Sequence, residues 1–172
     1  DKLSDKIMGD PKDDVDIGPM VSIEARDEVH DQVCRSIEAG AKLKLGGIIP
    51  KEVGAFYPIT LLSEVEPGMT AFDEEIFGPV VTIHKFTNDE HAIQIANNTR
   101  YGLAGSIWTE DLEKANKVAE SIHTGMIWIN TWLHRDLRTP FGGVKDSGIG
   151  REGGRWSIGF FSETMNICTK HD

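Results

Sequence analysis

The sequence has few features of a secreted, membrane-spanning or nucleic-acid-binding protein. Its two cysteines, Cys34 and Cys168, lie far apart, and neither belongs to a Cys-x-x-Cys pair. No apolar run approaches the roughly 18 residues of a membrane helix, and we expect no signal peptide. The 18 Lys and Arg are outnumbered by 28 Asp and Glu, and this net charge of −10 argues against binding to nucleic acid or anionic membranes. We expect a cytoplasmic protein whose thiols are small buried hydrophobes in a reducing compartment.

Metal-binding patterns are also missing. The six histidines show no ligand spacing, so zinc is not expected. The acidic run at 13–16 lacks the alternating ligands and closing Glu of a calcium loop. What remains is an ordinary globular composition, 39% hydrophobic and 27% charged over 172 residues. The chain opens in polar residues without a cap or strand signal, and we interpret that opening as the continuation of something upstream.

The apolar periodicity predicts an α/β protein. Ser22 and Asn88 are placed to cap helices, and Gly40 and Gly125 to end them. We expect helices at about 23–39, 89–97, 110–123 and 154–160, and strands at about 42–45, 56–62, 80–86, 103–109, 126–130 and 164–169.

From Val80 onward the order strand–helix–strand–helix–strand predicts a parallel βαβαβ sheet covered by helices. Ligands gather at the carboxyl ends of such strands, which here are 109–110 and 130–133. The segment 131–155 is a long loop rich in Arg and Gly, as functional loops often are. Its Arg135 and Arg138 are candidates to bind a carboxylate through their guanidinium groups, with simple surface charge as the alternative.

Three further patterns have local explanations. Glu74 and Glu75 precede the strand at Val80, and because neighbouring residues point to opposite faces, one should face solvent and the other whatever lies beside the loop. The run 148–153 satisfies G-x-G-x-x-G but follows a loop and opens no long helix, so we interpret it as a tight backbone passage. Arg151, Glu152 and Glu163 are candidates for a structural ion-pair network.

Four motifs in order resemble the C-terminal part of the NAD(P)-dependent aldehyde dehydrogenase superfamily. They are Glu74–Val80, 97–104 (NNTRYGLA), Gly125–Asn130 and 140–152 (PFGGVKDSGIGRE). The resemblance implies that residues 1–163 form the C-terminal part of the catalytic domain, and residues 164–172 an oligomerisation strand and tail. It further implies a homo-oligomer, a dimer or a tetramer.

The resemblance also implies roles for single residues. Glu75 resembles the carboxylate that holds the nicotinamide-ribose hydroxyls, Phe77 the aromatic beside it, and Leu103 an apolar wall for the nicotinamide. NAD or NADP is the implied cofactor, with NAD favoured. Glu152 resembles an acid that relays protons from the catalytic base, and Phe141 a residue lining the aldehyde tunnel.

Arg151 and Glu163 resemble a pair that braces the subunit interface.

In the family a cysteine thiolate attacks the aldehyde, hydride passes to NAD(P), and a glutamate-activated water hydrolyses the thioester. The resemblance places that nucleophile, that base and the Rossmann domain N-terminal to this region. Neither Cys34 nor Cys168 matches the nucleophile. We therefore expect the isolated chain to be inactive and its partner to be the N-terminal part of the same enzyme.

The implied substrate is a semialdehyde that carries a carboxylate. Residues 130–141 resemble the branch acting on 2-hydroxymuconic and 2-aminomuconic semialdehydes, where an Arg matching Arg135 binds the substrate carboxylate. Residues 18–30 and 67–72 resemble the succinate-semialdehyde branch instead. The alternative from a different class is a non-catalytic module that acts in assembly or partner binding.

Overall fold

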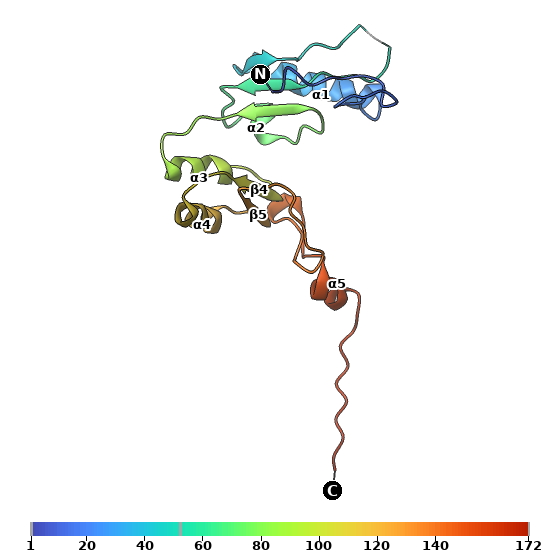
Figure 1. The fold of residues 1–172 in the computed structure, drawn as a ribbon, viewed down its shortest axis with the longest axis vertical. Helices are drawn as coiled ribbons and strands as arrows, with labels where there is room; N and C mark the ends of the chain where they lie inside the picture. The colour runs from blue at the N-terminus through green and yellow to red at the C-terminus, as the bar shows by residue number, and fades with distance from the viewer. Residues whose placement is uncertain (1, 52, 172) are drawn as a thin grey trace. The chain divides into compact units, whose positions relative to one another are not determined.

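A computed structural model describes residues 2–51 and 53–171 of the chain. The chain divides into two compact units, residues 1–87 and residues 88–172 (Figure 1). The outer limits of the expected segments 1–163 and 164–172 fall on residues outside the described part. Among the described residues, no helix is both long and apolar enough to cross a membrane.

The first unit combines two helices with a mixed three-stranded sheet. Its elements are α1 (Ile23–Glu38), β1 (Lys42–Leu45), β2 (Thr60–Ser63), α2 (Thr70–Asp73) and β3 (Val80–Ile83). The strand order is β1-β2-β3, with β1 antiparallel and β3 parallel to β2. The expected strand at 56–62 begins only at Thr60, because Pro58 has no backbone N–H to donate to a neighbouring strand.

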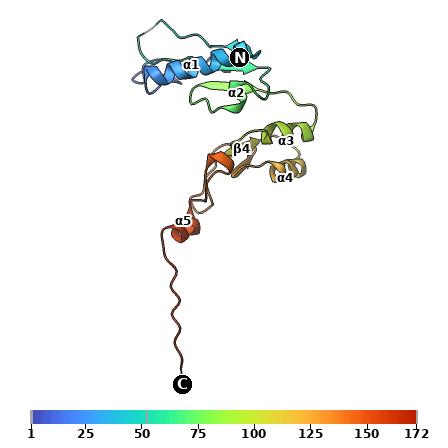
Figure 2. The same ribbon diagram turned by 180° about the vertical axis from the view of Figure 1, so that it is seen from behind.

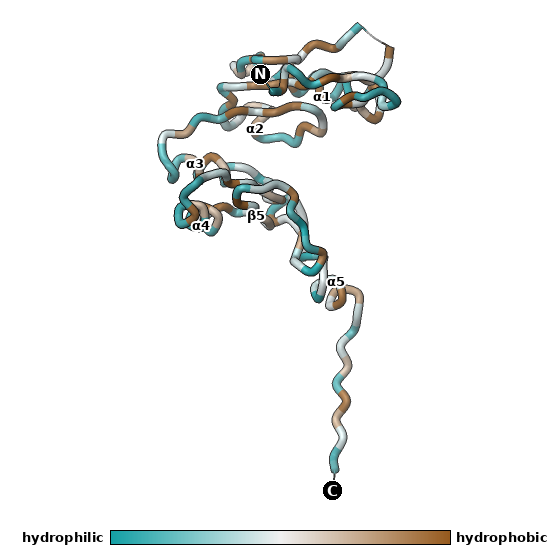
Figure 3. The backbone as a smooth tube through the Cα atoms, in the orientation of Figure 1, coloured by the Kyte–Doolittle hydropathy of each residue, from teal (hydrophilic) through white to brown (hydrophobic). Residues whose placement is uncertain are grey.

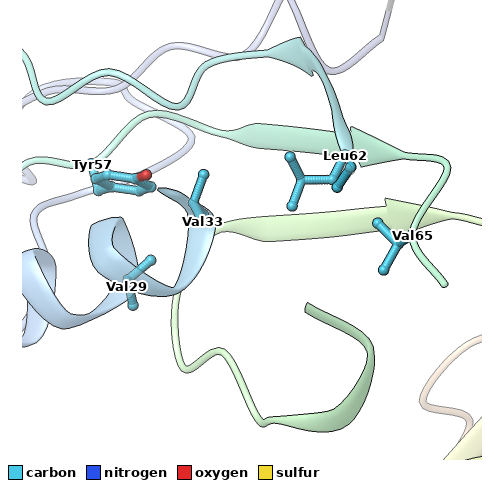
Figure 4. Close-up of a cluster of buried hydrophobic side chains, with 6 residues drawn as sticks. Val29, Val33, Tyr57, Leu62 and Val65 are labelled. Atoms are coloured by element: carbon cyan, nitrogen blue, oxygen red, sulfur yellow. The ribbon is translucent and has the colours of Figure 1, made fainter. Parts of the chain in front are cut away.

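Helix α1 supplies one side of the core of this unit. Ser22 caps it as predicted, since its side chain accepts a hydrogen bond from the Ala25 amide. Val29 and Val33 are spaced by one turn and pack against Tyr57 and Leu62 (Figure 4). Leu62 and Tyr57 are fully buried, so this cluster excludes water and fixes α1 on the sheet.

The second unit contains a strand–helix–strand crossover. Its elements are α3 (Asp89–Asn97), β4 (Ala104–Ile107), α4 (Leu112–Ser121), β5 (Met126–Ile129), η1 (Lys145–Ser147) and α5 (Gly154–Phe160). Strands β4 and β5 are parallel, with Ala104 opposite Met126, and α4 connects them. The predicted cap at Asn88 is confirmed by its bond to the His91 amide. Helices α3 and α4 contact each other and lie side by side in both views (Figure 1, Figure 2).

The α/β content is confirmed, but the predicted single βαβαβ sheet is wrong. Among the described residues, β3 pairs with β2, where Thr60 lies opposite Val80, and β4 pairs with β5 in a separate sheet. The backbone groups of β3 are bonded to the strand before it in the sequence. Of the two predicted crossovers, the one from β4 through α4 to β5 is therefore present in the described part of the chain, and the one from β3 to β4 is not.

The C-terminal segment forms no strand in this structure. Residues 162–171 form neither helix nor strand, and Figure 3 shows this segment as an extended tube that ends at the C-terminus. The apolar Met165 and Ile167 are each 79% exposed. A strand needs a partner edge to satisfy its backbone groups, so pairing of 164–169 with another subunit stays a prediction. Cys168 lies on this segment and is exposed, which corrects its interpretation as a buried hydrophobe. Cys34 is partly buried on α1, with its Sγ 3.6 Å from Nε2 of His30.

Candidate functional site

The loop between α2 and β3 is tied to α1 through Glu74. Nη1 of Arg35 lies 3.1 Å from one carboxylate oxygen of Glu74, and Nε2 of Gln32 donates to the other at 3.1 Å. Gln32 also donates to the backbone carbonyl of Glu75 at 3.1 Å. The hydrogen bond from Arg35, followed by that from Gln32, lowers the pKa of the Glu74 carboxyl. Glu74 is therefore the acid that holds the loop in place.

Glu75 is the acid left available. Within residues 2–51 and 53–171 no donor is bonded to its carboxylate. It lines a hollow of about 310 Å³, the Glu75 hollow, formed by Met20, Val21, Ala25, Glu28, Val29, Gln32, Glu75, Phe77 and Gly78. Phe77 beside it is 83% exposed. An ionised carboxylate only accepts hydrogen bonds, so this corner suits a ligand that offers hydroxyl donors and a flat apolar ring.

Gly78 explains how the loop lies so close to α1. A Cβ atom added at Gly78 would lie 2.9 Å from Cγ2 of Val29 and 3.0 Å from Cγ1. The close approach of this backbone to α1 therefore requires a residue without a side chain. Gly78 and Val29 both line the Glu75 hollow, so this close contact forms one of its walls.

A larger hollow lies in the second unit and contains three of the predicted site residues. This Arg135 hollow, of about 590 Å³, is lined by residues 125–128, 134–137, 139–141, 152–154 and 157. The guanidinium carbon of Arg135 lies 4.1 Å from the centroid of the Phe141 ring. Nη2 of Arg135 lies 3.6 Å from Oε1 of Glu152. A cation, an aromatic ring and a carboxylate thus meet on one surface.

The backbone holds Phe141 and Glu152 together. The Phe141 amide donates to the Glu152 carbonyl at 2.9 Å, and the Glu152 amide donates back at 2.8 Å. Close packing of glycines supports this bridge, since a Cβ at Gly153 would lie 2.3 Å from the carbonyl oxygen of Thr139. The predicted tight backbone passage at 148–153 is therefore confirmed only at Gly153, since a Cβ at Gly148 would lie no closer than 3.8 Å to another atom and a Cβ at Gly150 would meet none within 4 Å. The helix that follows, α5, has only seven residues.

The loop that carries Arg135 is anchored at its start. Nε1 of Trp128 donates to the carbonyl of His134 at 2.9 Å, and the Trp128 and Trp132 rings meet edge-on at 5.3 Å. At the carboxyl ends of β4 and β5, the Thr109 backbone and the Asn130 side chain exchange two hydrogen bonds. This reciprocal pair links the ends of the two strands. The predicted ligand-binding residues 109–110 and 130–133 do not line the Arg135 hollow, which is lined by residues 125–128 and by the loop after β5 instead.

The two candidate arginines of this loop differ in their surroundings. Nε of Arg138 donates to both carboxylate oxygens of Asp136, at 2.9 and 3.0 Å, and the Arg138 side chain is 87% exposed. That bond also lowers the pKa of Asp136. Arg138 does not line the hollow, so Arg135 is the arginine that the structure places there.

The predicted network of Arg151, Glu152 and Glu163 is not formed within the described chain. Nη1 of Arg151 donates to the backbone carbonyls of Gly143 and Gly150, at 2.8 and 2.6 Å. Glu152 faces Arg135 instead, and Glu163 is exposed on the C-terminal segment. An interface role for Arg151 and Glu163 stays a prediction.

Leu103 precedes β4 and is 47% exposed in the second unit. Among the predicted site residues, Glu75 and Phe77 lie together in the Glu75 hollow. Arg135, Phe141 and Glu152 lie together in the Arg135 hollow, and Leu103 lines neither hollow. Two contributing residues were missed from the sequence. The signal for Gln32 was a polar residue on the apolar face of α1. The signal for Trp128 was its indole N–H, which needs a hydrogen-bond acceptor when the ring is packed against other side chains.

Comparison with known proteins identifies the relatives of this chain. The model of the aldehyde dehydrogenase family matches residues 1–167. The 2-hydroxymuconic semialdehyde dehydrogenase of Pseudomonas sp. (strain CF600) is 40% identical over 170 residues, which cover 95% of this chain and 35% of the relative. An NAD(P)+ succinate semialdehyde dehydrogenase of Escherichia coli (strain K12) is 41% identical over 161 residues, covering 93% of this chain and 35% of the relative.

A solved structure agrees with these sequences. The Mycobacterium tuberculosis aldehyde dehydrogenase complexed with NAD+ superposes with a TM-score of 0.88 at 41% identity, covering 94% of this chain and 34% of that chain. The resemblance to the aldehyde dehydrogenase family inferred from four motifs is confirmed. The chain spans about a third of the length of these relatives.

Proposed function

Because this chain belongs to the aldehyde dehydrogenase family, we propose that it forms part of an NAD(P)-dependent enzyme that oxidises a carboxylate-bearing semialdehyde to the acid. The observation that carries the proposal is the Arg135 guanidinium, which is stacked on Phe141 and lines a hollow of about 590 Å³. The relatives named for semialdehyde oxidation support the same substrate class.

We assign the substrate carboxylate to Arg135. A guanidinium presents a planar set of N–H donors that matches the two oxygens of a carboxylate. Stacking on Phe141 restricts the guanidinium, so less conformational freedom is lost when an anion binds. Asp136 engages Arg138, which leaves Arg135 as the cation of the hollow. Phe141 then lines the path of the aldehyde.

We assign the nicotinamide-ribose to the Glu75 hollow. The Glu75 carboxylate accepts hydrogen bonds from the ribose hydroxyls, while Phe77 packs beside the ribose and the nicotinamide. Leu103 lies outside this hollow, and its role as an apolar wall for the nicotinamide stays a prediction from the family resemblance. When bound, the cofactor supplies the hydride acceptor. NAD is favoured, in keeping with the NAD+ complex of the Mycobacterium tuberculosis relative.

We place the cysteine nucleophile and the general base of the thioester pathway outside these 172 residues. The chain spans about a third of its relatives, and neither Cys34 nor Cys168 lines either hollow. Glu152 then contributes to proton relay, and Arg151, Glu163 and residues 164–172 to subunit contacts. The chain alone is accordingly expected not to reduce NAD.

The test is a comparison of substrates with the complete product of the gene that encodes this chain. Reduction of NAD is followed at saturating cofactor with succinic semialdehyde, butanal and betaine aldehyde. We expect the anionic substrate to have the highest kcat/KM, because it alone carries a partner for Arg135. A preference for betaine aldehyde, or equal rates with succinic semialdehyde and butanal, would refute the substrate class.

A further inference from the structure

The ion pair between Arg135 and Glu152 is unusually loose. Its atoms are 3.6 Å apart, whereas a charge-assisted hydrogen bond between a guanidinium and a carboxylate is about 2.7–2.9 Å long. The side chains are 44% and 66% exposed, so water screens their attraction. Little free energy is lost if another carboxylate replaces Glu152.

The guanidinium of Arg135 also has unused donors. Within residues 2–51 and 53–171 its N–H groups make no hydrogen bond, and the guanidinium lies over the Phe141 ring. Neighbouring arginines differ, because Arg138 is bonded to Asp136 and Arg151 to two backbone carbonyls. Arg135 is thus held in place by Phe141 and Glu152 with hydrogen-bonding capacity left over.

The bridge between Phe141 and Glu152 makes the arrangement a fixed platform. Since the two backbones exchange hydrogen bonds, the ring beneath the guanidinium and the carboxylate beside it are positioned by the same pair of residues. The Glu152 side chain can turn away without breaking that bridge, because only its backbone takes part.

We propose that Glu152 is a stand-in for the substrate carboxylate, occupying the Arg135 guanidinium in the empty site and leaving it when an anionic substrate binds. This inference rests on the proposed role of Arg135. Glu152 acts as a positioning residue that keeps the guanidinium over Phe141 until substrate arrives. Binding of the substrate carboxylate then releases the Glu152 carboxylate, so recognition at Arg135 and the availability of Glu152 are coupled.

The experiment measures succinate binding to the 172-residue chain by NMR, with the Nε–H signal of Arg135 as the probe. Glu152→Gln removes the competing charge and keeps the shape and the backbone bridge, so succinate should bind about two- to fivefold more tightly, which is the worth of an exposed ion pair. Glu120→Gln removes the same charge from an exposed position on α4 outside the hollow and should leave the affinity unchanged. In the wild-type chain, succinate should also shift the side-chain carboxyl 13C signal of Glu152, and Arg135→Gln should abolish that shift.

Two failures are distinguishable. If Arg135→Gln abolishes succinate binding but Glu152→Gln leaves the affinity unchanged or weaker, the exchange is wrong and the role of Arg135 stands. If succinate binds equally well without the Arg135 side chain, or binds to neither the wild-type chain nor the Glu152→Gln variant, both the exchange and the carboxylate assignment fail. An equal gain in affinity for Glu120→Gln would also overturn the exchange, since the effect would then come from net charge.

Discussion

Gly125 is the position where a single added carbon should disturb the second unit most. A Cβ there would lie 1.7 Å from the carbonyl oxygen of Gly142 and 2.8 Å from its carbon. Normal contact requires these backbones to separate by more than an ångström. The Gly125 and Val144 amides both donate to the carbonyl of Gly102, so separation also strains two hydrogen bonds.

Gly125→Ala should therefore lower the free energy of unfolding of this unit by about 2–4 kcal/mol. Overpacking contributes about 1–3 kcal/mol, and the two weakened hydrogen bonds together contribute about 1 kcal/mol. All four tryptophans of the chain lie between residues 108 and 156, so tryptophan fluorescence follows this unit specifically. In urea the unfolding midpoint should fall by about 1–2 M.

The matched control for this substitution is Gly159→Ala. No atom lies within 4 Å of the added Cβ, and the residue is inside α5. Alanine is the better helix former, so stability should stay constant or rise by up to about 1 kcal/mol. An unchanged midpoint for Gly125→Ala, or equal losses for the two variants, would refute the close packing at Gly125.

Two further predictions concern the first unit and the cysteines. Hydrogen bonds from Arg35 and Gln32 lower the pKa of Glu74 below its ordinary 4.5, so the stability they add should be complete above pH 4.5 and lost as the pH falls through the lowered pKa. Glu74→Gln should remove this part of the pH dependence of stability, measured by circular-dichroism unfolding curves. If the variant keeps the wild-type pH dependence, the prediction is wrong. Cys168 is exposed and Cys34 partly buried, so iodoacetamide should modify Cys168 first when the chain is followed by peptide mass spectrometry, whereas faster labelling of Cys34 would contradict the packing of α1.

Local signals in the sequence predicted the local structure. Ser22 and Asn88 were identified as caps because a short polar side chain before an apolar repeat satisfies free helix amides, and both accept such bonds. The β4-α4-β5 crossover followed from one strand–helix–strand pattern. The partner strand of β3 could not be predicted in this way, because a four-residue apolar strand has the same pattern whether it pairs with the strand before it or after it.

The candidate site was predictable only in part. The motif resemblance named Arg135, Phe141 and Glu152 as separate candidates, and the structure brings them into one hollow through the backbone bridge between Phe141 and Glu152. No local pattern distinguished Arg135 from Arg138. The two arginines differ because Asp136 accepts a hydrogen bond from Arg138, and this contact forms only in the folded loop.

The central claim is that Arg135 selects an anionic aldehyde, and its most direct test is the ratio of kcat/KM for succinic semialdehyde to that for butanal. In the complete gene product, Arg135→Gln should lower this ratio about 10- to 100-fold, since a hydrogen bond to a charged group contributes about 1.5–3 kcal/mol. Arg155→Gln is the matched control, because Arg155 also stacks on an aromatic ring, that of Trp156, but lies outside the hollow. We predict a fall for Arg135→Gln alone; an unchanged ratio, or an equal fall in the control, would contradict the claim.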